Sequence, residues 1–130
     1  MTQQKLKFRC LTGPRYAILR LDADSTVPDW ATRGEFTSIS RTADELSIVC
    51  PIENIPADVR SPHRWICLKL LGPFPFSLTG VLLSFIEPLS SKGIPIFAVS
   101  TYDTDYVLVQ EERMEAALEA LQSAGHELLS

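Results

Sequence analysis

The sequence has little of what several common classes of protein require. Its 130 residues include only three cysteines, Cys10, Cys50 and Cys67, with no Cys-x-x-Cys spacing, so we expect buried, reduced thiols. No apolar run approaches the ~20 residues of a membrane span. The N-terminal stretch MTQQKLKFRC also lacks the apolar segment of a signal peptide. These absences predict a cytoplasmic protein without a membrane partner.

Clustered basic charge is also missing. Twelve Lys and Arg against sixteen Asp and Glu give a formal net charge of −4. The nearest approach to a cluster, Lys5, Lys7 and Arg9, alternates as the wet face of a strand does. A nucleic-acid groove needs grouped Lys and Arg, so we expect no nucleic-acid partner.

Catalytic motifs are absent too. The chain has no Gly-x-Ser-x-Gly, no P-loop and no Cys–His pairing. His126 follows a predicted helix end, where it should contact helix carbonyls. Asp22-x-Asp24 and Asp103-x-Asp105 are a spacing that can hold a divalent cation, but no Gly-rich phosphate loop accompanies either pair. We therefore predict no enzyme activity, no cofactor and no metal.

What is present is a regular alternation of strand and helix signals. Apolar and β-branched runs predict strands at residues 5–11, 16–21, 36–42, 46–50, 64–71, 94–100 and 106–110, with a further short strand possible at 126–129. One helical turn is expected to start at Pro28, which suits a first helical position. Between the strands of the first half the chain is otherwise predicted to be loop, with a very short helix as the alternative within residues 51–63.

Two helices are predicted in the second half. The first presents one apolar face and ends at Lys92-Gly93, with Pro88 removing the backbone bond to Ser84; its face is Leu78, Leu82, Phe85, Ile86 and Leu89. The second begins in the acidic pair at 111–112 and closes at Gly125; its buried stripe is Met114, Ala117, Leu118 and Leu121. We expect the core to include Leu82, Phe85, Ile86, Val99, Leu108, Leu118 and Leu121.

The second half also repeats the first. Residues 39–49 align without a gap with 99–109, an offset of sixty, and residues 16–21 align with 65–70, an offset of forty-nine. The difference falls where the second half has a full helix and the first has only residues 25–34. Two copies of one supersecondary unit explain this order; chance similarity between β-rich segments is the alternative.

The element order defines the expected fold class. After residue 62 it is strand, helix, strand, strand, helix and short strand, a ferredoxin-like βαββαβ unit of an α+β fold. We expect residues 1–61 to form an N-terminal unit of this kind with a reduced first helix, and residues 62–130 to form the C-terminal unit. The sheet should be mostly antiparallel, with helices on one face.

The stretch STYDTDYVLV, residues 100–109, is the candidate site. A simple chain reversal favours Asn-Gly or a Gly-containing loop, yet neither this turn nor its counterpart at 40–45 has one. Strand alternation places Asp105 with Val107 and Val109 on one face, which suits a carboxylate bordering a pocket. Asp and Thr also favour turns for local reasons, so turn capping is the alternative for Asp103 and Asp105.

The segments GPFPFSLTGVL and PLSSKGIPIFAVSTYDTDYVLV, within residues 72–112, resemble the ACT domain. More narrowly, they are similar to the small tandem-ACT proteins related to the CASTOR arginine sensors, and residues 16–51 resemble the first copy in such proteins. This resemblance implies a regulatory module, without catalysis, that binds an amino acid or similar small molecule between the loop after the first strand and the facing strands.

Carried over position by position, the resemblance implies ligand-binding residues in two groups. The loop supplies backbone N–H groups to a ligand carboxylate and the hairpin supplies a polar wall; the residues are Phe76, Ser77, Thr79, Gly80 and Val81, and Ser100, Thr101, Asp103 and Asp105. A helix start at Gly80 favours an anion, while the carboxylates suit an ammonium or guanidinium group. Close helix–strand packing is the alternative explanation for Gly80.

A second class of function fits the same elements. Exposed sheet edges invite pairing unless they are blunted, so we expect a homodimer. The chain could then be an interaction module that pairs sheets with itself or with a partner enzyme and binds no ligand. Trp30 and Trp65 are core residues or interface anchors.

Overall fold

The computed structural model describes residues 4–11, 13–75 and 79–129. Contacts divide the chain into a first unit, Gly13–Trp65, and a second unit, Ile66–Ser130 together with the N-terminal segment through Thr12. The expected boundary lay between residues 61 and 62 and left the N-terminal strand in the first unit. Its backbone pairing instead joins it to the second unit, a long-range partnership that local patterning cannot reveal.

The second unit is a five-stranded sheet covered by helices. Its strands lie in the order β6-β7-β5-β1-β8, with bounds β1 Lys7–Cys10, β5 Trp65–Leu70, β6 Ile96–Ser100, β7 Asp105–Gln110 and β8 Glu127–Leu129. The helices are α1 Val81–Ser91 and α2 Met114–Ser123, the latter preceded by the 3-10 turn η3 Glu111–Arg113. From β5 to β8 the order is the predicted ferredoxin-like βαββαβ.

One strand has been added to that arrangement. β1 lies between β5 and β8: Phe8 pairs with Leu70 in the antiparallel direction and with Leu128 in the parallel direction. The expectation of a mostly antiparallel sheet is met elsewhere, and β1–β8 is the parallel exception. Lys5, Lys7 and Arg9 are exposed while Leu6 and Phe8 are buried, which confirms the alternation predicted for this strand.

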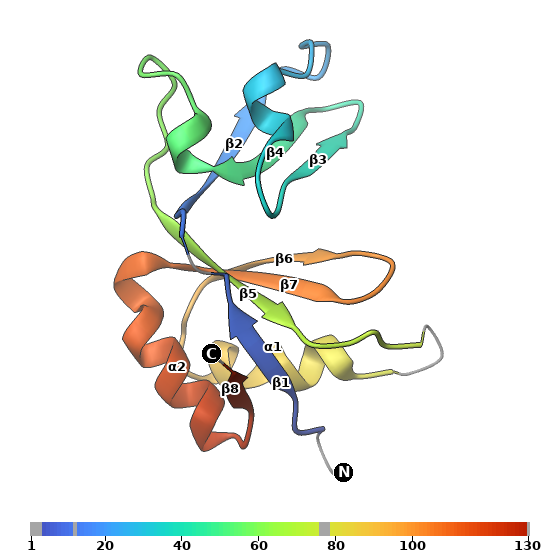
Figure 1. Ribbon diagram of the computed structural model, residues 1–130, viewed down its shortest axis with the longest axis vertical. Coiled ribbons are helices and arrows are strands. Elements are labelled where there is room, and N and C mark those ends of the chain that lie inside the picture. Colours follow the sequence, from blue (N-terminus) through green and yellow to red (C-terminus); the bar gives the residue numbers. More distant parts are fainter. Residues whose placement is uncertain (1–3, 12, 76–78, 130) are drawn as a thin grey trace. The chain divides into compact units, whose positions relative to one another are not determined.

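The helices lie side by side on one face of this sheet (Figure 1). Their inward side chains meet alternate residues of the strands, and the core includes Leu6, Phe8, Ile66, Leu68, Leu70, Val81, Phe85, Leu89, Val107, Val109, Ala117 and Leu121. The rings of Phe8 and Phe85 meet edge-on with centroids 5.2 Å apart. Among the described residues, no helix has the length and apolar character needed to cross a bilayer.

The predicted core is right at its centre and wrong at its margin. Phe85, Leu108 and Leu121 are fully buried, whereas Leu82, Ile86 and Leu118 are half-buried against the core and Val99 is half-buried on β6. The inward face of α1 is centred on Val81, Phe85 and Leu89, so Leu82 and Ile86 lie at its margin. Leu78 lies outside the described residues.

The first unit is a smaller antiparallel sheet in the order β3-β4-β2. Its elements are β2 Tyr16–Leu21, η1 Asp29–Thr32, β3 Ser38–Arg41, β4 Leu46–Pro51 and η2 Ile52–Asn54. The 3-10 turn η1 stands where the second unit has α1, as the reduced helix predicted. The core pairs directly across β2 and β4, as Ala17 with Cys50 and Leu19 with Ile48, and Trp30 packs against it.

The hairpins of the two units close in the same way. In the first unit the N–H of Thr42 donates to the carbonyl of Glu45 at 2.9 Å, and in the second the N–H of Thr101 donates to the carbonyl of Thr104 at 2.8 Å. Each threonine hydroxyl also accepts the N–H three residues on, at 3.2 and 3.4 Å. Thr42 therefore corresponds to Thr101, an offset of 101 − 42 = 59.

The alignment at an offset of sixty is thus wrong by one residue at the hairpin. In the first unit Ile48 and Cys50 face the core, and in the second Val107 and Val109 do so. An offset of sixty residues would instead align Ile48 with Leu108. A slip of one residue exchanges the two faces of a strand. Both strands are apolar on both faces, so the sequence pattern could not distinguish the two alignments. The offset of forty-nine at the first strand agrees with the faces.

Candidate functional site

The turn between β6 and β7 is internally bonded. Ser100 and Asp105 are the last cross-strand pair, and the Ser100 hydroxyl donates to Oδ1 of Asp105. Thr101 uses its hydroxyl within the turn, where it donates to the Thr104 carbonyl at 3.1 Å. Asp103 is exposed and Asp105 is half-buried. Turn capping is therefore part of the role of Ser100 and Thr101, and the Ser100 bond uses one of the two carboxylate oxygens of Asp105.

This turn is attached to the loop that follows β5. The N–H of Phe74 donates to the carbonyl of Asp103 at 3.0 Å, and the Thr104 hydroxyl donates to the carbonyl of Leu70 at 2.6 Å. Gly72 also lies close, because a Cβ built on it would stand 3.0 Å from the Asp103 carbonyl oxygen. The hairpin therefore contacts the start of this loop, at residues 70–74, which precede the residues predicted to bind a ligand. Phe76 and Ser77 lie outside the described residues.

The start of α1 forms the other part of the predicted site. Gly80 is its N-cap with φ 80°, a left-handed conformation that favours glycine. No atom of the described residues lies within 4 Å of a Cβ built there, so close packing against them does not explain this glycine. Thr79 is exposed and its carbonyl accepts the Gln4 side-chain amide at 3.0 Å. The Val81 side chain is buried in the core, which leaves its backbone N–H as the group that a ligand could use.

Asp105 occupies a position that is apolar in the other copy. At the corrected offset its counterpart is Leu46 (105 − 46 = 59), which is fully buried in the core of the first unit. Asp105 lies on the same strand face as Val107 and Val109, as strand alternation predicted, and these valines are core residues. A carboxylate at the border of an apolar layer is costly without a hydrogen-bond partner. The change from Leu46 to Asp105 therefore distinguishes the second turn from the first.

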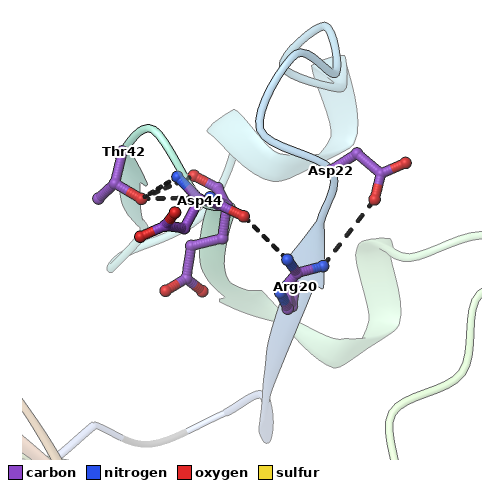
Figure 2. A network of polar contacts seen from close by, with 5 residues as sticks. Arg20, Asp22, Thr42 and Asp44 are labelled. Atoms are coloured by element: carbon purple, nitrogen blue, oxygen red, sulfur yellow. Dashed lines mark hydrogen bonds and ion pairs between the residues drawn. The ribbon is translucent and has the colours of Figure 1, made fainter.

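The corresponding turn of the first unit is occupied by its own contacts (Figure 2). Arg20 reaches across from β2, where its guanidinium donates to the Asp44 carbonyl at 2.8 Å and lies 3.9 Å from the Asp22 carboxylate. The Thr42 hydroxyl accepts the N–H groups of Asp44 and Glu45. These are exposed contacts that stabilise a surface turn.

Metal binding finds no support in the described part of the chain, where no three His, Cys, Asp or Glu side chains gather. Cys50 and Cys67 are buried and Cys10 is half-buried, and these three cysteines form no disulfide with one another. One hollow of about 480 Å³ among the described residues is lined at the C-terminal ends of α1 and α2 by residues that include Pro88, Lys92 and Glu119.

Sequence reasoning did not select Thr104 or Gln4. Thr104 has only 7% of its surface exposed, and its importance lies in a hydrogen bond to a residue thirty-four positions away. The one available signal was the contrast between copies, since Glu45 stands at the equivalent place in the first turn. Gln4 is placed by the pairing of β1, and nothing in the local sequence indicates that placement.

Family comparison agrees with this division of the chain. Residues 60–123 match the model of the ACT domain, and residues 14–58 match a model described as an N-terminal domain. Because of this match the chain is an ACT-domain protein. ACT domains are regulatory modules. The human protein CASTOR3P is 29% identical over 105 residues, which cover 71% of this chain and 64% of that protein. The chain is thus similar to a protein of the CASTOR family, and it spans less than two thirds of the length of this relative.

Solved structures extend the comparison. A protein from Agobacterium tumefaciens is 49% identical with a TM-score of 0.89, over 97% of this chain and 93% of that one. A Vibrio cholerae protein is 19% identical, with a TM-score of 0.72 over 93% and 91%. The aspartate kinase of Clostridium acetobutylicum is 11% identical, with a TM-score of 0.59 over 86% of this chain and 33% of the kinase. The last two likenesses show the fold alone.

Proposed function

We propose that the chain is a regulatory protein whose second unit binds an amino acid or a similar small molecule. The site lies between the start of α1 and the β6–β7 turn. One observation carries the proposal: the turn bearing Asp105 is bonded to the loop that leads into α1, through Phe74 to Asp103 and through Thr104 to Leu70. Family membership supplies the regulatory class.

The two sides of this site offer opposite charges. The first N–H groups of an α-helix have no partner within the helix and carry the positive end of its dipole, so Gly80 and Val81 suit a ligand carboxylate. Asp105 and Asp103 suit an ammonium or guanidinium group. Ser100, Thr101 and Thr79 complete the polar wall, and Phe76 and Ser77 are retained from the family resemblance. An α-amino acid carries both charges.

We propose that the chain has no catalytic activity, no nucleic-acid partner and no cofactor, and that it acts in the cytoplasm. The support is the composition: a net charge of −4 without a basic cluster, and no nucleophile–base motif.

The test is a thermal-shift screen of the purified chain against the standard amino acids, each at millimolar concentration, followed by equilibrium dialysis of any that raises the melting temperature. A ligand that binds the native state alone stabilises it by about 2.7 kcal/mol at one hundred times its Kd. We expect a clear shift for at least one amino acid. An unchanged melting temperature with every amino acid of the set would contradict ligand binding.

An exposed edge favours a second candidate function, a module that associates through its sheet. Within the described residues β6 pairs with β7 alone, so it presents an edge that bears the half-buried Ile96, Phe97 and Val99. Leu83 on α1 is 59% exposed. We propose a homodimer on this basis, and sedimentation should give a mass above the 14.5 kDa of one chain. A dimer whose melting temperature no amino acid changes would favour the interaction module.

A further inference from the structure

The two hairpin turns share their backbone but differ in how they are held. In each, a threonine closes the turn, as Thr42 and Thr101 do. The residue three positions later is the half-buried Glu45 in the first unit and the buried Thr104 in the second. Its backbone makes the same bonds in both copies. The side chain alone differs, and in the second copy it points to another element.

Thr104 joins the turn to the end of β5. Its hydroxyl donates to the carbonyl of Leu70, the last residue of that strand, at 2.6 Å, and Leu70 is itself fully buried. A buried carbonyl that loses its donor costs more than the bond contributed, because water cannot replace it. The Thr104 hydroxyl therefore fixes the distance between the turn and the residue from which the loop toward α1 departs.

A second bond makes this attachment directional. The N–H of Phe74 donates to the Asp103 carbonyl at 3.0 Å. Asp103 is therefore bonded to Phe74, and Thr104 is bonded to Leu70. Gly72 leaves the space for this approach. Asp105 is the next residue along the chain, so the bonds of residues 103 and 104 also restrain the backbone from which the Asp105 side chain projects.

We propose that Thr104 is a positioning residue for the small-molecule site: its hydroxyl holds the Asp103–Asp105 segment against the loop that leads to α1 and so aims the Asp105 carboxylate at the ligand. This inference rests on the proposed function. It adds a residue that makes no contact with the ligand and that neither the sequence motif nor the turn geometry of the first unit requires.

The experiment compares Thr104→Val, which keeps the shape and removes the hydroxyl, with Thr104→Ser, which restores the donor. Thr42→Val removes the equivalent turn hydroxyl of the first unit. Val109→Ala truncates a core residue of β7 and serves as a control for lost stability. Each chain is titrated by equilibrium dialysis with whichever standard amino acid shifts the wild-type melting temperature most, and the exchange rate of the Phe74 amide is measured by NMR.

For Thr104→Val we expect affinity about tenfold weaker, the scale of one lost hydrogen bond. We also expect about tenfold faster exchange at Phe74. Thr104→Ser should recover most of both, while Val109→Ala and Thr42→Val should keep wild-type affinity.

If the wild-type chain binds and Thr104→Val binds equally well, Thr104 has no positioning role. If Val109→Ala loses as much affinity as Thr104→Val, the effect is general destabilisation and the inference fails. If no standard amino acid binds the wild-type chain, the proposed function falls and this inference falls with it.

Discussion

His126 Nε2 lies 2.8 Å from the carbonyl oxygen of Ser84, and that carbonyl is the one that Pro88 deprives of its helical donor. Proline has no N–H, so the bond from residue 88 back to residue 84 is missing. The Nδ1 atom of the same ring accepts the N–H of Leu6 at 3.0 Å, so Nε2 carries the proton and donates. His126 was expected near helix C-terminal carbonyls. It instead donates to the Ser84 carbonyl within α1, and it links that helix to the N-terminal segment through Leu6.

Replacing His126 by Ala should destabilise the chain by about 2–4 kcal/mol, because it leaves the Leu6 N–H and the Ser84 carbonyl buried and unpaired and opens a cavity. Urea unfolding followed by circular dichroism measures this. His63→Ala, at an exposed loop position, is the control and should change stability by no more than about 0.5 kcal/mol. Equal effects of the two substitutions would contradict the role given to His126.

Pro88→Ala should partly rescue His126→Ala. An alanine in place of Pro88 supplies an N–H that can bond the Ser84 carbonyl, so the loss caused by His126→Ala should be about 1 kcal/mol smaller in the Pro88→Ala background. The four proteins of this double-mutant cycle are compared by urea unfolding. A loss of the same size in both backgrounds would show that His126 does not act through the carbonyl that Pro88 leaves free.

Asp105→Asn should weaken the binding of a cationic amino acid by about ten- to a hundredfold, the range of a charge-assisted hydrogen bond at a half-buried site. Folding should change little, since the asparagine oxygen can still accept the Ser100 hydroxyl. Equilibrium dialysis measures the affinity. Asp44→Asn, in the equivalent turn of the first unit, is the matched control and should bind as the wild type does. Unchanged binding in Asp105→Asn would leave the second turn with a structural role only.

Gly80 and Gly72 should respond to alanine for different reasons. Gly80→Ala meets no atom of the described residues but is strained at φ 80°, so we expect a loss of about 1 kcal/mol. Gly72→Ala would bring its Cβ to 2.9 Å from Phe74 and 3.0 Å from the Asp103 carbonyl, so the loop and the turn must separate. Amide exchange at Phe74 should therefore rise in Gly72→Ala and stay unchanged in Gly80→Ala. The reverse pattern would contradict the contact between loop and turn.

Cys50 should react with thiol reagents more slowly than Cys10 does. Burial raises the pKa of the Cys50 thiol from 9.0 to about 11, so at pH 8 its thiolate fraction is roughly a hundredfold below that of an unshifted thiol. Labelling with a chromogenic disulfide should be much faster at the half-buried Cys10, and a Cys50→Ser variant assigns the slow phase. Rapid labelling of Cys50 in the native chain would contradict its burial.

The same shift gives a pH dependence of stability. A raised pKa in the folded state means that the folded chain holds this proton more tightly than the unfolded chain. Its contribution is fully present below pH 9 and is lost as the pH rises from 9 to about 11. Cys50→Ala should show a flatter fall in the free energy of unfolding over this interval. An identical slope in both proteins would contradict the assignment.

Local patterning predicted the elements well. The strand 16–21 has the predicted bounds, and the helical turn after Pro28, the Gly93 and Gly125 helix ends and the short last strand are all present. These features depend on side-chain periodicity and on glycine and proline geometry, which neighbouring residues determine. The positions of Asp105, Val107 and Val109 on one strand face follow from the same rule.

The register of the repeat and the attachment of the candidate site were decided by tertiary structure. Whether Leu46 corresponds to Tyr106 or to Asp105 depends on which strand face meets the helices, and strands that are apolar on both faces do not encode that choice locally. The insertion of β1 between β5 and β8, the bond from Thr104 to Leu70 and that from His126 to Ser84 join residues far apart in the chain. The sequence by itself determined where strands, helices and turns occur, because those follow from short-range sterics and periodicity. Only the packed structure decided which hydroxyl and imidazole groups meet which carbonyls, because such bonds form once the core has brought distant segments together.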